Sequence, residues 1–156
     1  MPKVYLILTD DKNVLIGKGG RSGSTRSERL GYHLPGGKSK GTDNKNKLTT
    51  ALRELKEETG IELENPQQFG QDIIPSDSGG AIFVIVKTES VSSLVESFNN
   101  LDPQDRPKIV NRFDEPFTEL MSLPLKNCWN NSNFSEDYYT NYFGFGLREA
   151  VKLLER

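Results

Sequence analysis

Short apolar runs alternate along the chain with polar segments, and this pattern predicts a series of strands. The runs at 4–8 and 14–17 are separated by Asp-Asp-Lys-Asn, a turn signal, so we expect them to form a hairpin. The run at 82–86 is apolar on both faces and is therefore expected at the centre of a sheet. Strands are predicted at 4–8, 14–17, 32–34, 68–74, 81–88 and 119–123.

Three segments have the composition or periodicity of helices, and 48–59 is the clearest. Its apolar stripe consists of Leu48, Ala51, Leu52 and Leu55. Gly60 follows at the position where a left-handed C-terminal cap is expected. A short helix is predicted at 91–99, and 134–155 contains a terminal helix that is clearest from Leu147 onward.

Strands and helices mix along the chain without an internal repeat or a linker segment. Such mixing indicates an α/β or α+β fold. The length of 156 residues suits a single core and is large enough to fold without metal or disulfide links. We therefore expect one domain spanning 1–156.

The composition narrows the class of protein. A formal net charge of −2 argues against a general nucleic-acid or membrane-surface binder, because such proteins are usually basic. Cys128 is the only cysteine, which excludes an internal disulfide and a cysteine metal cluster. Neither a transmembrane run nor a signal-peptide pattern is present. We expect a cytoplasmic protein. A homodimer is compatible with the sequence.

Three carboxylates mark one face of the helix predicted at 48–59. At about 100° per residue, Glu54, Glu57 and Glu58 fall within roughly a third of the helix circumference. Neighbouring like charges destabilise a helix unless a cation lies against them. Mg²⁺ is a natural candidate, since it takes oxygen ligands and shares them with substrate phosphates. The alternative is an ordinary solvated face, because glutamate and lysine are strong helix formers.

Two motifs surround this glutamate face. Leu-Pro-Gly-Gly ends at Gly37 and predicts a glycine turn before the helix. Arg-Glu-Leu-Lys-Glu-Glu-Thr-Gly-Ile occupies 53–61. Together they resemble the signature of the Nudix hydrolases, whose second half is matched completely. The spacing from Gly37 to Arg53 is about two residues longer than in the family, and the first glutamate has no clear counterpart. Counting back from Arg53 gives Lys45, and counting forward from Gly37 gives Asp43, which is the candidate to support the arginine.

The resemblance implies a mixed sheet between layers of helices and a hydrolase that uses Mg²⁺, with Mn²⁺ as a substitute. Its implied substrate is a small nucleoside-diphosphate-linked molecule, such as a nucleotide sugar, ADP-ribose or a nucleoside triphosphate, cleaved at the diphosphate bond. It also implies metal ligation by Glu54, Glu57 and Glu58, with the backbone carbonyl of Gly37 as a further ligand. Arg53 is expected to orient the glutamates by ion pairing.

Basic residues gather in two loops and are candidates to bind substrate phosphates. In the long loop at 18–29 they include Arg21, Arg26 and Arg29; after the glycines they are Lys38, Lys40, Lys45 and Lys47. The alternative is that both segments are ordinary solvated loops.

A general base is harder to place from the sequence. The resemblance implies an acidic residue on a loop far along the chain, and Glu115 is the first candidate. Asp114 and Glu119 follow it, and Glu54 is a further alternative. Any one of the loop acids also fits an ordinary solvated position.

A second function is open beside hydrolysis: a Nudix-fold module that senses a nucleotide without cleaving it. The longer insert and the missing first glutamate favour this function, whereas the intact motif at 53–61 favours hydrolysis. A role in RNA decapping has less support, because the chain carries no appended RNA-binding domain and no overall basic charge. Nucleic acid is therefore not an expected partner.

Overall fold

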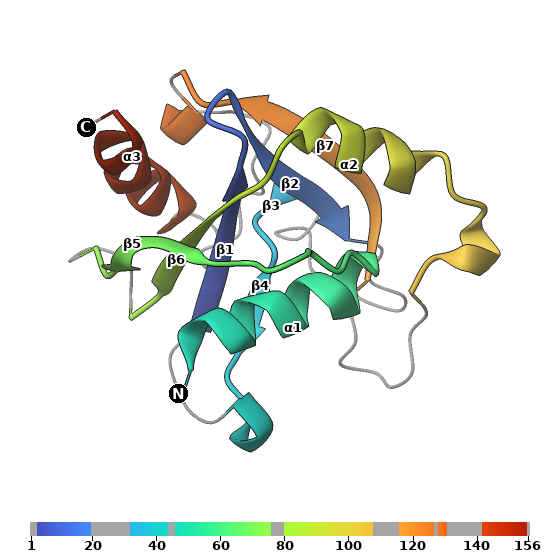
Figure 1. Ribbon diagram of the computed structural model, residues 1–156, viewed down its shortest axis with the longest axis horizontal. Helices are drawn as coiled ribbons and strands as arrows, with labels where there is room; N and C mark the ends of the chain where they lie inside the picture. Colours follow the sequence, from blue (N-terminus) through green and yellow to red (C-terminus); the bar gives the residue numbers. More distant parts are fainter. Residues whose placement is uncertain are drawn as a thin grey trace.

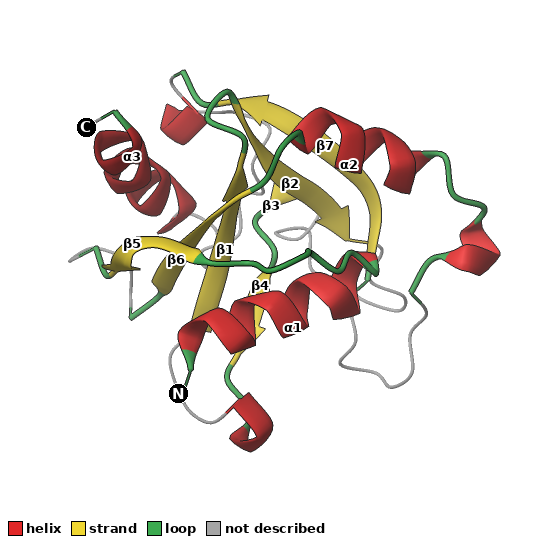
Figure 2. Cartoon of the chain, viewed as in Figure 1, coloured by secondary structure: helices red, strands yellow, loops and turns green. Residues whose placement is uncertain are grey.

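The computed structural model describes residues 3–19, 32–43, 46–75, 80–107, 116–126, 128–130 and 142–155. The strands in these ranges are β1 (Lys3–Thr9), β2 (Asn13–Gly19), β3 (Tyr32–His33), β4 (Gly36–Lys38), β5 (Gln68–Ile73), β6 (Ile82–Lys87) and β7 (Phe117–Pro124) (Figure 1). The α-helices are α1 (Lys47–Thr59), α2 (Val91–Asn99) and α3 (Tyr142–Leu154) (Figure 2). None of these helices is long and apolar enough to cross a membrane.

All seven strands belong to one mixed sheet whose centre is formed by β1 and β6. These two strands run parallel, in register from Val4 opposite Ile82 to Thr9 opposite Lys87. Both are buried on both faces, as their continuous apolar sequences predict. On the other side of β1, β2 pairs only near the connecting turn, and β4 pairs with the first half of β1. The divergence of β1 and β2 thus leaves room for β4 within the sheet.

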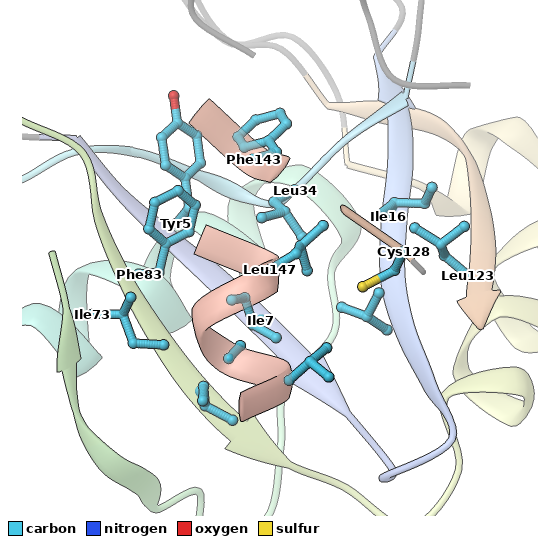
Figure 3. Close-up of a cluster of buried hydrophobic side chains, with 14 of the residues drawn as sticks. Tyr5, Ile7, Ile16, Leu34, Ile73, Phe83, Leu123, Cys128, Phe143 and Leu147 are labelled. Atoms are coloured by element: carbon cyan, nitrogen blue, oxygen red, sulfur yellow. The ribbon is translucent and has the colours of Figure 1, made fainter. Parts of the chain in front are cut away.

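The sheet is covered by helices on both faces, and alternate residues of β1 pack toward opposite layers. Tyr5 and Ile7 contribute to a cluster with Phe143 and Leu147 of α3 (Figure 3). The intervening residues of β1 pack in a second cluster with apolar side chains of α1 and α2. Figure 1 shows α3 on one side of the sheet and the other two helices across from it. The expected mixed sheet between helical layers is confirmed.

Most predicted elements are confirmed with bounds that shift by at most two residues, but the segment after Pro35 differs. The sequence predicts a glycine turn there, whereas Gly36 and Gly37 lie in β4 and pair with Tyr5 and Val4. A Cβ atom on Gly36 would collide with the backbone carbonyl oxygen of Val4. Glycine is therefore required because the two backbones approach closely, and a strand without apolar side chains gives no strand signal.

Candidate active site

Helix α1 is held at both ends by side-chain and backbone caps. The Asn46 side chain accepts a hydrogen bond from the backbone N–H of Thr49, at 3.1 Å. At the other end, Gly60 has a φ of 79°, and its N–H bonds the carbonyl of Lys56. Ala51 and Leu55 are buried against the sheet. This packing fixes the rotation of the helix and directs its glutamate face along β4.

Strand β4 lies directly against two of the three glutamates. The backbone N–H of Gly36 donates to Glu58 Oε1 at 2.9 Å, and the Glu58 side chain is buried. A Cβ atom on Gly37 would lie 2.6 Å from Glu54 Oε1. The absence of a side chain at Gly37 thus makes the space that the Glu54 carboxylate occupies.

A Gly37→Ala variant tests this close approach. We expect kcat/KM to fall by about tenfold or more, because the sequence predicts a catalytic role for Glu54 and small displacements of a catalytic group are costly. The free energy of unfolding should change little, since only the end of the Glu54 side chain has to move. Gly41→Ala is the matched control, because nothing lies within 4 Å of a Cβ at that position. Equal activity of Gly37→Ala and Gly41→Ala would contradict a role in activity for the close approach of Gly37 to Glu54.

Arg53 connects the glutamates to one another. Its Nη1 donates to Glu54 Oε1 at 3.1 Å and to Glu57 Oε2 at 3.0 Å, the second contact spanning one helical turn as the spacing predicts. Its Nη2 donates to the backbone carbonyl of Lys38 at 3.0 Å. The arginine side chain is only 18% exposed and the Glu54 side chain 14% exposed, whereas Glu57 is 45% exposed. Arg53 therefore fixes both carboxylates relative to β4.

Asp43 holds the opposite edge of the guanidinium group. Its Oδ1 accepts from Arg53 Nε at 2.9 Å and its Oδ2 from Nη2 at 3.0 Å, a two-point ion pair. The Asp43 side chain is 1% exposed, and Oδ2 also accepts from Thr50 Oγ1 and the backbone N–H of Lys40. The Arg53 hydrogen bonds hold the pKa of this carboxyl well below its usual range, against the opposing effect of burial. Of the two positions that counting leaves open, Asp43 is thus the one that supports the arginine; Lys45 lies outside the described residues.

Within the longer spacing, the described residues form a 3₁₀ turn at Gly41–Asp43. The Asp43 N–H bonds the carbonyl of Lys40 at 2.9 Å, and the Asp43 carbonyl accepts from Asn46, the cap of α1. The insert is therefore tied to the start of the helix. These contacts explain how Asp43 reaches Arg53, although its side chain is shorter than the glutamate of the family motif and its position is shifted.

The described part of the site carries excess negative charge. Among the described residues, four carboxylates outnumber the two cations that contact them, Arg53 and Lys40, by two when all are ionised. Burial raises the pKa of Glu54, and the Arg53 guanidinium opposes that rise. A divalent cation would balance this excess.

The chemistry of these donors fits Mg²⁺ or Mn²⁺, which take carboxylate and carbonyl oxygens. As the side chains stand, the described residues contain no group of three acidic, histidine or cysteine side chains arranged to hold a metal ion. Glu54 and Glu57 are directed instead toward Nη1 of Arg53. The fit therefore rests on donor type and charge.

Five of the predicted residues are outside the described ranges, so their roles stay predictions: Arg21, Arg26, Arg29, Asp114 and Glu115. Lys38 is at the exposed end of β4, where its carbonyl contacts Arg53.

Glu119 lies on β7 and accepts a hydrogen bond from the hydroxyl of Tyr32, across β2. This hydrogen bond is the main reason why the pKa of Tyr32 is raised to about 12. Glu119 thus has a partner of its own, separate from the contacts of Arg53.

Comparisons with known proteins place this site in a family. The NUDIX domain model matches residues 1–137, and the chain therefore belongs to the Nudix family. No curated protein sequence matches the chain.

Three solved structures share its fold. A MutT/Nudix family protein from Listeria innocua has a TM-score of 0.54 and 16% identity, covering 100% of this chain and 99% of that one. RenU, a Nudix hydrolase from M. Smegmatis, has a TM-score of 0.56 and 12% identity, covering 97% and 86%. The Nudix domain of Shewanella oneidensis NrtR, complexed with ADP ribose, has a TM-score of 0.52 and 16% identity, covering 99% and 86%. At these identities the likeness shows the fold alone.

Proposed function

We propose that this protein is a Mg²⁺-dependent hydrolase that cleaves a diphosphate bond in a small nucleoside-diphosphate-linked substrate. The observation that carries the proposal is the ordered glutamate face. Buried Asp43 forms an ion pair with Arg53. Arg53 in turn fixes Glu54 and Glu57 beside the glycines of β4. Such order has little value on a solvated helix face, where ion pairs contribute little to stability. It is useful where carboxylates must hold an ion in a defined position.

Each residue has a proposed role. Glu54, Glu57 and Glu58 hold the ion together with the carbonyl of Gly37, and Arg53 keeps the glutamates in place. When bound, Mg²⁺ supplies charge neutralisation of the diphosphate and favours attack by water. Mn²⁺ should substitute for it.

The substrate contacts are proposed from the sequence pattern. Lys38 and the arginines at 21, 26 and 29 bind the phosphates. Glu115 is the proposed general base on sequence grounds alone, with Glu54 as the alternative. Glu119 is less suited, because its carboxylate is hydrogen-bonded to Tyr32.

A nucleotide-sensing module is the second candidate. The solved Nudix domain of NrtR is a complex with ADP ribose, which is compatible with nucleotide binding by this fold. Under this function the same face would bind a nucleotide without cleaving it. That nucleic acid is not a partner stays a prediction.

Both functions are tested by incubating the protein and Mg²⁺ with ADP-ribose, nucleotide sugars, dinucleoside polyphosphates and nucleoside triphosphates. Phosphorus NMR detects the new phosphate groups that hydrolysis produces, and calorimetry detects binding. Turnover of one class would support the hydrolase and identify its substrates. Binding without products would favour the sensing module.

A further inference from the structure

Lys40 occupies an unusual place beside the glutamate face. It belongs to the longer insert between β4 and the turn at Gly41–Asp43. Its backbone N–H donates to Asp43 Oδ2 at 2.8 Å, and its carbonyl accepts from the Asp43 N–H at 2.9 Å. These two hydrogen bonds fix the backbone of Lys40 relative to the buried Asp43. They therefore define where the Lys40 side chain begins.

The side chain of Lys40 reaches back to the glutamates. Its Nζ lies 3.6 Å from Glu57 Oε1, and the two side chains are 61% and 45% exposed. The positive charge also acts on Glu54: burial raises the pKa of that carboxyl, and Lys40 is among the cations that oppose the rise. One ammonium group therefore contacts Glu57 and also acts electrostatically on Glu54, two of the carboxylates that we assign to the metal.

We propose that Lys40 is a tethered counter-cation of the glutamate face, which pairs with Glu57 and competes there with a divalent cation. The inference rests on the metal site of the proposed function. To bind the ion, Glu57 has to give up its contact with Lys40, and the ion then lies near a like charge. Lys40 therefore lowers the affinity of the site for metal and raises the Mg²⁺ concentration at which it fills.

The test is the dissociation constant of Mn²⁺ for the full chain, measured by electron paramagnetic resonance at low ionic strength without nucleotide. Lys40→Gln should bind Mn²⁺ about two- to fivefold more tightly, the range expected for an exposed ion pair. Lys40→Arg should bind as the unmodified protein does. The difference should shrink near 1 M salt, where the screening length falls to about 3 Å.

Lys56→Gln is the matched control. This exposed lysine is on α1, as the glutamates are, but it pairs with Glu62. Its Mn²⁺ affinity should stay unchanged. Unchanged or weaker binding by Lys40→Gln would overturn the inference, as would equal tightening by Lys56→Gln, which would indicate a general charge effect.

The same measurement on a Glu58→Gln variant distinguishes failure of this inference from failure of the proposed function. If that variant loses Mn²⁺ while Lys40→Gln binds like the unmodified protein, only the role of Lys40 fails. If Glu58→Gln binds Mn²⁺ as well as the unmodified protein, the metal assignment fails and the role of Lys40 fails with it. Circular dichroism of each variant confirms that the fold is kept.

Discussion

Glu58→Gln should lower Mg²⁺-dependent turnover by at least about 100-fold without unfolding the protein. Removing a residue that only supports a metal ligand costs about 10- to 100-fold, so loss of a direct ligand should cost more. The fold should persist because a glutamine oxygen can still accept the 2.9 Å hydrogen bond from Gly36. Glu57→Gln should have a comparable effect on turnover.

This prediction is checked by kcat at saturating Mg²⁺ together with a thermal unfolding curve for each variant. Glu62→Gln is the control, since Glu62 is exposed and forms an ion pair with Lys56. Unchanged rates in Glu58→Gln would refute the metal assignment.

Asp43→Asn should have the largest effect on stability, lowering the free energy of unfolding by about 3 kcal/mol. The variant replaces a buried charge and leaves the Arg53 guanidinium facing an amide instead of a carboxylate. Turnover should also fall by about 10- to 100-fold, because Arg53 would no longer be held against the glutamates. Denaturant unfolding and kcat measure the two effects.

The stability difference should depend on pH in a defined direction. In the folded protein the pKa of Asp43 lies below its ordinary value, so its contribution is fully present above about pH 4. It is lost as the pH falls from there toward the folded pKa. The gap between the unmodified protein and Asp43→Asn should therefore narrow below pH 4; a constant gap would contradict the ion pair.

The layered fold was predictable because its signals are local. The continuous apolar run of β6 and the apolar stripe of α1 each predict burial, and both elements are confirmed with bounds that shift by one residue. Strand β4 was not predictable in the same way. Its pairing with β1 is a tertiary contact made by glycines, which have no side-chain pattern to read.

The glutamate face was also predictable, since helical geometry alone groups Glu54, Glu57 and Glu58. The choice between Asp43 and Lys45 was not, because the conformation of an insert decides which residue reaches Arg53. The pairing of Lys40 with Glu57 was missed for a similar reason. In the sequence, Lys40 is one of several lysines in a polar segment, and only the 3₁₀ turn directs it to the helix.

The central claim is tested most directly by product release from the best substrate of the nucleotide panel, measured across a Mg²⁺ series that begins in EDTA. A diphosphate hydrolase of this kind gives no products in EDTA and a rate that rises to saturation with Mg²⁺. Turnover that persists in EDTA would contradict the metal-dependent mechanism. Nucleotide binding without products at every Mg²⁺ concentration would contradict hydrolysis itself.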